Sequence, residues 1–163
     1  MDAAVVVAAV FGEVGDAKVM VDMYNADPSV AGIIMSQEVD PSVVDKYGII
    51  SLKAGTTDEL DNIVEKPNIG EAPSTLASYG RYLLRPSIFE HLNPLALGKD
   101  GELWTVDAIT KVALTQRVVV GKTKGQWMTT GDPENYFHAH LKFVINHEKY
   151  GSKVKTWVDE ISK

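Results

Sequence analysis

Apolar runs and helical periodicity alternate along the first part of the chain. Residues 5–10 and 30–36 are continuous apolar runs, which are typical of strands buried on both faces of a sheet. Between them, apolar residues over 19–24 recur at helical spacing, and Pro28 ends the pattern. A strand, a helix and a strand in this order predict a right-handed parallel crossover.

The next segment predicts a β-hairpin formed by residues 47–53 and 60–66, because a turn sequence rich in Gly and Thr separates two strand-like runs. Gly48 stands at the start of the first strand. A glycine in a strand either marks a bulge or allows a ligand to come close to the backbone, and the pattern alone leaves both interpretations open.

The second strand of this hairpin ends in Glu65-Lys66-Pro67. Pro67 cannot donate to a sheet ladder and is expected to hold Lys66 in an extended conformation. Glu65 and Lys66 are therefore predicted at the carboxyl end of a strand, where open α/β sheets bind ligands.

The remaining elements follow from caps and periodicity. They are a short helical turn opened by Asp40-Pro41, a strand over 78–84, a short helix from Arg85, a helix over 104–116 with Thr105 as a possible cap, a strand over 118–121, a helix capped by Asp132, and a last helix capped by Ser152 with Val154, Trp157, Val158 and Ile161 inward. Together they predict an α/β fold, with a mixed, mostly parallel sheet and flanking helices, over residues 1–163 as a single domain.

Composition excludes several classes of function. The chain of 163 residues has no cysteine, which removes disulfides, thiol catalysis and cysteine zinc sites, and its four histidines lack metal-ligand spacing. The net charge of −6 argues against nucleic-acid binding. No apolar run is long enough to cross a membrane, and Asp2 stands where a signal peptide would carry basic residues, so a cytoplasmic protein is expected.

Six short motifs follow one another over residues 40–150. They are Lys46-Tyr-Gly-Ile-Ile50, Val64-Glu-Lys-Pro67, Ala72-Pro-Ser-Thr-Leu-Ala77, Gly80-Arg-Tyr-Leu-Leu84, Gly101-Glu-Leu-Trp-Thr-Val-Asp-Ala-Ile109 and Thr130-Gly-Asp-Pro-Glu-Asn-Tyr136. Their order and gaps resemble the C-terminal half of the UTP:glucose-1-phosphate uridylyltransferases, or UDP-glucose pyrophosphorylases, within the sugar-phosphate nucleotidyltransferases. The resemblance implies the C-terminal part of a Rossmann-like nucleotidyltransferase fold.

Enzymes of this family join glucose 1-phosphate to UTP and release pyrophosphate, with magnesium between the phosphates. The resemblance implies that the Gly48 backbone lies against the sugar ring, that Glu65 accepts hydrogen bonds from sugar hydroxyls, and that Lys66 meets the sugar phosphate. The full implied substrate-binding set is Tyr47, Gly48, Glu65, Lys66, Glu102, Thr105 and Asp107. The alternatives are an exposed ion pair for Glu65 and Lys66 and a helix cap for Thr105.

The chain departs from the family pattern at two places. The family's glycine-rich phosphate loop is missing, and Val7-Ala8-Ala9 stands in the neighbourhood of its magnesium-binding Leu-Pro-Asp. Many relatives have a second acid, in Asp-x-Gly, where this chain has Thr129-Thr130-Gly131, and Asp132 is better suited to capping a helix. Magnesium is expected for the family, but its usual ligands are not found here, so no catalytic or metal-binding residue is assigned. We expect the chain alone to be inactive.

The expected ligands are UDP-glucose or glucose 1-phosphate. Without the N-terminal nucleotide-binding part, apolar sheet edges should be covered by a homodimer, a larger oligomer or a separate N-terminal half. Neither a nucleic acid nor a membrane is expected as a partner. The alternative functions are a non-catalytic module for sugar-nucleotide binding, oligomerisation or regulation, and an unrelated α/β binding domain.

Overall fold

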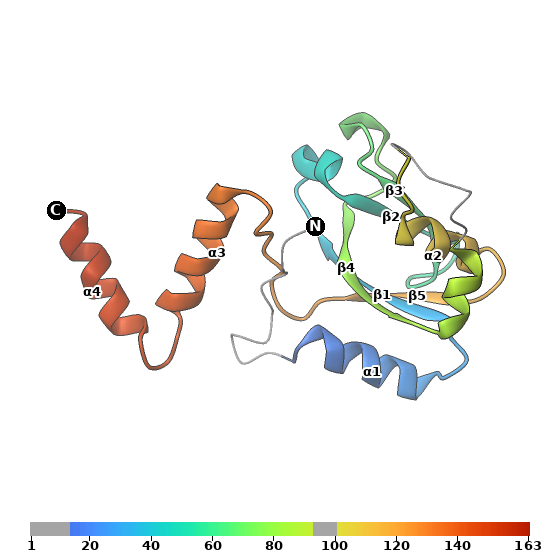
Figure 1. Cartoon of the computed structure of the whole chain (residues 1–163), viewed down its shortest axis with the longest axis horizontal. Helices are drawn as coiled ribbons and strands as arrows, with labels where there is room; N and C mark the ends of the chain where they lie inside the picture. The colour runs from blue at the N-terminus through green and yellow to red at the C-terminus, as the bar shows by residue number, and fades with distance from the viewer. Residues whose placement is uncertain (1–13, 93–100) are drawn as a thin grey trace. The chain divides into compact units, whose positions relative to one another are not determined.

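A computed structural model of the chain describes residues 14–92 and 101–163 (Figure 1). It divides into two compact units. We call Asp16–Thr123 the sheet unit, and Met1–Gly15 with Lys124–Lys163 the helical unit. The strand predicted over residues 5–10, and with it the predicted parallel crossover, lies outside the described residues.

The sheet unit contains a five-stranded sheet in the order β3-β2-β4-β1-β5. The strands are β1 (Gly32–Glu38), β2 (Gly48–Leu52), β3 (Leu60–Glu65), β4 (Leu76–Leu84) and β5 (Val118–Lys122). The mixed α/β class is confirmed. The predicted predominance of parallel pairing is wrong for these five strands, because only β1 and β5 pair in parallel, whereas the β2–β3 hairpin and β4 make antiparallel pairs.

Helices cover both faces of the sheet (Figure 1). On one face, α2 (Thr105–Ala113) and the 3-10 helix η4 (Pro86–His91) bury a cluster that includes Ile34. On the other face, α1 (Asp16–Ala26) packs near Met35, the next residue of β1. A Cβ atom at Gly121 would stand 2.7 Å from Met35 Sδ and 3.0 Å from Met23 Sδ, so a glycine lets α1 pack closely here.

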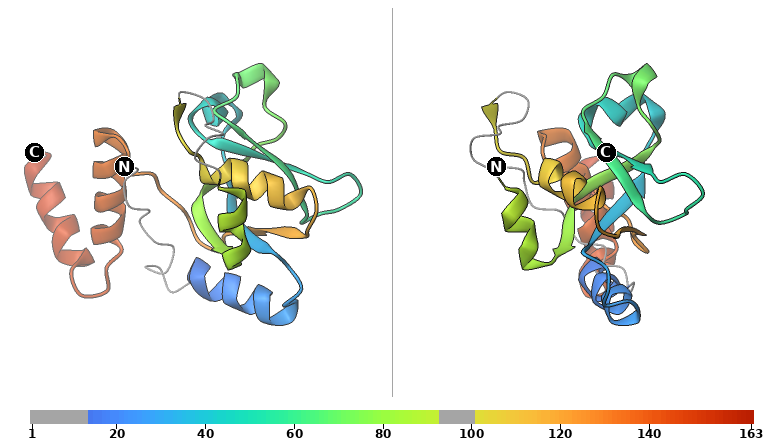
Figure 2. Two further views of the ribbon diagram at one scale, coloured as in Figure 1. Left: turned by 45° about the vertical axis from the view of Figure 1, so that its right-hand side comes forward. Right: turned by 90° about the vertical axis from the view of Figure 1, so that its right-hand side faces the viewer.

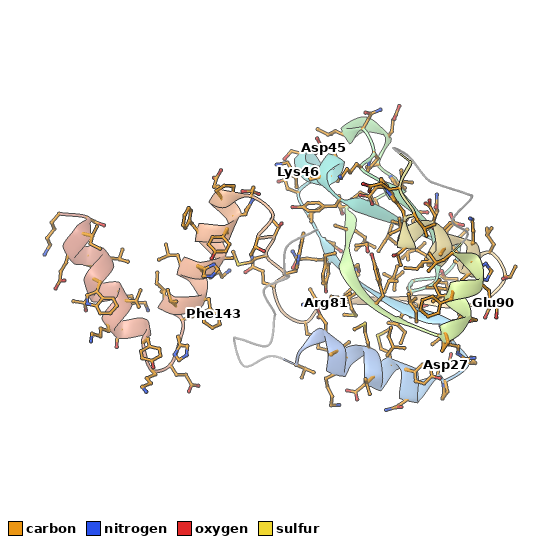
Figure 3. The ribbon with its side chains drawn as sticks, in the orientation of Figure 1. Asp27, Asp45, Lys46, Arg81, Glu90 and Phe143 are labelled. Carbon is orange, nitrogen blue, oxygen red and sulfur yellow. The ribbon has the colours of Figure 1, made fainter. Side chains whose placement is uncertain are left out.

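Two further 3-10 helices flank the β2–β3 hairpin. They are η2 (Pro41–Lys46), which precedes β2 and carries Asp45 and Lys46 (Figure 3), and η3 (Ile69–Glu71), which follows β3. The Asp40 carboxylate accepts a hydrogen bond from the Ser42 N–H at 2.8 Å, so the predicted helical turn and its cap are confirmed. Both helices lie at the end of the hairpin opposite its turn (Figure 2).

The hairpin turn reaches the opposite edge of the sheet. Glu59 forms an isolated β-bridge with Val119 of β5, and the carbonyl of Asp58 accepts from the Val120 N–H at 2.7 Å. Arg117 holds this junction together with ion pairs to Asp27 at 2.6 Å, Asp58 at 3.2 Å and Glu59 at 2.9 Å. Asp27 lies just after α1 (Figure 3), so one guanidinium ties α1, the hairpin and β5 together.

The helical unit contains α3 (Pro133–Ile145) and α4 (Gly151–Ile161), which pack against each other. The predicted cap of α3 is confirmed, because Asp132 accepts from the Asn135 N–H at 2.9 Å. A Cβ atom at Gly151 would stand 2.3 Å from the Ile145 carbonyl oxygen, so α4 begins against the end of α3 only with a glycine.

Two predictions about α4 are wrong. Tyr150 occupies the position before the helix and no side chain caps it, so Ser152 lies inside the first turn. The side chains predicted to point inward are not buried, and Trp157 is 50% and Ile161 85% exposed. Two helices that touch along one side cannot bury a broad apolar face. No helix among residues 14–92 and 101–163 is long and apolar enough to span a membrane.

Candidate functional site

A row of polar and small residues crosses the sheet at the carboxyl ends of β1, β3 and β5. The backbone register joins, strand by strand, Glu65, Gly48, Ser78, Ser36 and Lys122. Residues paired across strands direct their side chains to the same face, and this is the face that α2 covers further along the strands. We call these five residues the polar row.

Glu65 and Gly48 are neighbours within the polar row. A Cβ atom at Gly48 would stand only 2.8 Å from Glu65 Oε2 and 3.1 Å from Ile63 Cγ2. The register irregularity between β2 and β3 falls at Ser51–Leu52, so Gly48 does not mark a bulge. The group that comes close to the Gly48 backbone in the structure is the Glu65 carboxylate, and the approach of a ligand stays a prediction.

The backbone conformation of Lys66 differs from the predicted one. Its φ of 45° is in the left-handed region, so the expected extended conformation is wrong. The Lys66 N–H donates to the Tyr47 carbonyl at 3.0 Å, which continues the β2–β3 pairing by one bond while the chain turns towards η3. A non-glycine residue in this region costs about 1 kcal/mol or more, and such strain is often found at functional sites.

Two hydroxyl groups that the sequence analysis missed lie on β4, which pairs with β2 at Gly48. Ser78, which is buried, has its Oγ 3.2 Å from the Tyr82 hydroxyl. Burial raises the pKa of Tyr82, the hydrogen bond with Ser78 lowers it, and the negative charge of Glu65 raises it. Tyr82 is therefore a neutral hydroxyl at neutral pH. The signal in the sequence was two hydroxyl side chains, four residues apart, within the apolar run of β4.

The carboxylate and these hydroxyls suit a polyol. An ionised carboxylate only accepts hydrogen bonds and can serve two neighbouring hydroxyl donors, whereas serine and tyrosine hydroxyls both donate and accept. A sugar offers the complementary groups at closely spaced positions. Within this group, the half-buried side chains of Glu65 and Tyr82 offer chemistry suited to a sugar.

The predicted site residues fall into two groups. The structure brings Tyr47, Gly48, Glu65 and Lys66 together at the paired ends of β2 and β3. Glu102, Thr105 and Asp107 form a second group, at and just before the start of α2.

This second group lies at the start of α2. Glu102 accepts from Trp104 Nε1 at 3.2 Å. Thr105 is the first residue of the helix and its side chain caps nothing, so the possible cap is wrong. The helix itself packs on β3, where Thr110 Oγ1 lies 3.4 Å from Asn62 Oδ1. A substrate-binding role for this group stays a prediction.

The described residues do not fit a magnesium site. Within residues 14–92 and 101–163, no three His, Asp or Glu side chains are grouped in a way that could hold a metal ion. Where relatives carry Asp-x-Gly, Thr129 Oγ1 accepts from the Gly131 N–H at 3.3 Å. Both Asp132 oxygens accept from Asn135, at 2.9 and 2.7 Å. The segment Val7-Ala8-Ala9 lies outside the described residues.

A shallow groove between η2 and η3 is separate from the candidate site. It is lined by Pro41, Val44, Ile69, Ala72, Ser74 and Thr75. None of the predicted site residues lines it, and it contains no charged side chain. The polar row remains the better candidate because it combines a carboxylate with several hydroxyls.

Comparisons with known proteins point in one direction. A model of the nucleotidyl transferase family matches residues 9–145. The UTP–glucose-1-phosphate uridylyltransferase of Haemophilus influenzae is 32% identical over 138 residues, and that of Pseudomonas aeruginosa is 39% identical over 124 residues. These alignments cover 82% and 75% of this chain but only 47% and 44% of the relatives.

Solved structures give the same result. A UTP-bound UGPase from Acinetobacter baumannii has a TM-score of 0.76 and 29% identity, over 96% of this chain and 53% of its own. A UDP-glucose pyrophosphorylase complexed with UDP-glucose has a TM-score of 0.70 and 34% identity, over 77% of this chain and 48% of its own. The chain thus spans about half the length of the proteins that it matches.

Proposed function

Because the chain belongs to the nucleotidyl transferase family, we propose that it is the sugar-binding and C-terminal helical part of a UTP:glucose-1-phosphate uridylyltransferase. The reaction of the whole enzyme joins UTP and glucose 1-phosphate to give UDP-glucose and pyrophosphate. The uridylyltransferases of H. influenzae and P. aeruginosa support this family assignment, with alignments over 82% and 75% of the chain. A single domain over residues 1–163 is part of the proposal. We further propose a cytoplasmic location, consistent with a sequence that has no cysteine for the disulfides of secreted proteins.

The observation that carries the proposal is the Glu65 carboxylate beside Gly48, with the hydroxyls of Ser78 and Tyr82 on the strand that pairs with β2 at Gly48. In the proposed complex, Glu65 accepts hydrogen bonds from two sugar hydroxyls, and the sugar ring lies against this carboxylate and the Gly48 backbone next to it. Lys66, at the turn after β3, meets the sugar phosphate as a point charge. Tyr47, Glu102, Thr105 and Asp107 border the same ligand.

Catalysis is a separate matter from sugar binding. We propose that the complete enzyme uses Mg²⁺, in keeping with its family, and that this chain alone does not form UDP-glucose. The support is chemical, because the described residues offer no metal-binding group. UDP-glucose formation from UTP and glucose 1-phosphate by the purified chain with Mg²⁺ would contradict this part of the proposal.

The same observation supports a second function. A chain that binds a sugar nucleotide without completing the transfer can act as a sensing, regulatory or oligomerisation module. Pairing with a separate N-terminal chain distinguishes the two functions. Activity that appears when such a chain is added supports a split enzyme, whereas unchanged binding without activity supports the module. In either case we propose a homodimer, a larger oligomer or a complex with a separate N-terminal half, without nucleic acid or membrane.

Calorimetric titration with UDP-glucose tests sugar binding. We expect the purified chain to bind UDP-glucose, and Glu65→Ala to weaken binding at least about ten-fold, because two hydrogen bonds to a charged group are lost. Asp61→Ala is the matched control, since this exposed acid lies on the same strand and accepts a hydrogen bond from the Ser51 hydroxyl at 3.2 Å. Equal affinity of the wild type and Glu65→Ala would exclude the polar row as the sugar site.

A further inference from the structure

Helix α4 carries an apolar stripe that its packing on α3 leaves exposed. We call it the α4 stripe, and its members recur at spacings of four, three and four residues: Tyr150, Val154, Trp157 and Ile161. Tyr150 and Trp157 are each 50% exposed and Ile161 is 85% exposed. Gly151, by contrast, is buried where α4 begins against the end of α3. Spacings of four and three residues are those of the seam between two helices of a coiled coil.

Two opposite charges flank the α4 stripe. Lys153 and Glu160 are seven residues apart, so they lie on the same side of the stripe, and both are exposed. Lys153 Nζ lies 5.2 Å from the centroid of the Trp157 ring, which places this charge directly beside the stripe. Seven residues, about 10 Å along a helix, separate the two charges within one chain. In the part of the chain that the structure describes, neither of them forms an ion pair.

The charges of α4 are placed against its helix dipole. Lys153 lies in the first turn and Glu160 in the last, whereas a helix is stabilised by acids at its amino end and by bases at its carboxyl end. This arrangement therefore does not stabilise α4 by itself. A second α4 packed antiparallel would offset it, because each end of one helix then meets the oppositely charged end of the other.

We propose that the α4 stripe is a contact between two copies of this chain, in which the two α4 helices pack antiparallel about a two-fold axis beside Trp157. An axis midway between positions 153 and 160 brings Lys153 of each copy next to Glu160 of the other, while the apolar side chains meet in the seam. Parallel packing would place Lys153 level with Lys153 and would gain no such pair. The proposal uses only the helical unit, so it is independent of the proposed sugar site.

Sedimentation equilibrium from micromolar to millimolar concentration tests the contact in the purified chain. Two helices of 11 residues make a small interface, so we expect a micromolar dissociation constant. Lys153→Glu and Glu160→Lys should each weaken dimerisation about ten-fold, because two attractive pairs become repulsive. The double variant, which exchanges the two charges, should restore the affinity of the wild type to within about three-fold.

Matched controls come from the same helix. Lys155→Glu and Asp159→Lys make the same changes of charge at exposed positions outside the stripe, and they should change the dissociation constant less than about two-fold. Lys153→Glu should bind UDP-glucose as the wild type does, so dimerisation and sugar binding are measured separately.

Disulfide crosslinking tests the antiparallel orientation. Because the chain has no cysteine, a mixture of Lys153→Cys and Glu160→Cys chains under mild oxidation should give a mixed dimer in which the second charge pair stays intact. Either variant alone should remain uncrosslinked, since the antiparallel pairing keeps equal positions about 10 Å apart along the helix.

Four results would overturn the proposal. The first is a chain that stays monomeric at millimolar concentration, as it would if the stripe packed on the sheet unit of its own chain. The second is a dimer whose affinity is unchanged in Lys153→Glu and Glu160→Lys, or falls equally in the two controls, because another surface would then form the contact. The others are a charge-exchanged variant that does not dimerise and a Lys153→Cys chain that crosslinks to itself.

Discussion

Gly48 and Glu65 face each other across β2 and β3, and the side chain of Glu65 lies over the backbone of Gly48. They are paired in register, and the space that a side chain at Gly48 would fill is taken by Glu65, whose Oε2 would lie 2.8 Å from such a Cβ atom. The absence of a side chain on β2 thus determines where the carboxylate of β3 points. The sugar site that we propose depends on this relationship.

Gly48→Ala should displace the Glu65 carboxylate. We expect UDP-glucose binding to weaken at least about ten-fold, because the carboxylate loses its hydrogen bonds to the sugar. Stability should change by less than about 1 kcal/mol, since the flexible end of Glu65 can move aside. Calorimetry and thermal melting measure the two effects. Gly70→Ala is the control, because a Cβ atom there meets nothing within 4 Å, and equal affinity in the two variants would contradict the relationship.

Arg117→Met should destabilise the sheet unit. Its guanidinium bridges Asp27, Asp58 and Glu59, and without it three acids remain near one another. The side chain is 37% exposed, so solvent screening limits the loss to about 1–2 kcal/mol. Urea unfolding measures this loss, which should shrink in 1 M salt. Lys18→Met, which removes an exposed pair with Asp22, should have almost no effect, and an equal loss in both variants would contradict the role of Arg117.

Ser42→Ala should raise the pKa of Asp40 towards its ordinary value. The Ser42 hydroxyl and then the Ser42 N–H hold this pKa below its ordinary range, with donor distances of 2.6 and 2.8 Å. Because the folded pKa is depressed, the stabilisation exists above pH 3.8 and is lost as the pH falls through the folded value. A carboxyl titration by NMR measures the change, with Asp27 as an internal control that should not move.

Asp132→Ala should destabilise α3 by about 1 kcal/mol, because an N-cap that binds the Asn135 N–H is lost. Asp132→Asn keeps a good cap and should retain the helix content. Circular dichroism and thermal melting of the two variants measure the difference. A loss of the same size in Asp132→Asn would show that charge, and not capping, is the contribution of this residue.

Helix caps and the hairpin could be predicted from the sequence, because a few neighbouring residues determine each of them. The cap of α3 follows from Asp132-Pro133, the cap of η2 from Asp40-Pro41, and the β2–β3 hairpin from its turn. In these places the deciding contacts lie within about four residues, so pattern and structure agree. The end of β3 at Glu65 was predicted for the same reason.

The sequence did not predict features that depend on contacts between residues distant along the chain. It also failed where a local pattern is compatible with two backbone conformations. Pro67 restricts Lys66, but the hydrogen bond to Tyr47 selects the left-handed conformation and not the extended one. Arg117 meets Asp58 and Asp27 across 59 and 90 residues, which no spacing reveals. Ser78 is next to Gly48 because β4 pairs with β2, and neither segment's sequence predicts the order of the strands in the sheet.

The most direct test of the proposed sugar site is an NMR titration of the isotopically labelled chain with UDP-glucose. The proposal predicts that the largest changes in amide chemical shift occur at Gly48 and Ser78, which belong to the polar row, and at Lys66, which follows Glu65. It also predicts that Glu65→Ala removes these changes. Shifts confined to other parts of the chain, or no shifts at millimolar UDP-glucose, would contradict it.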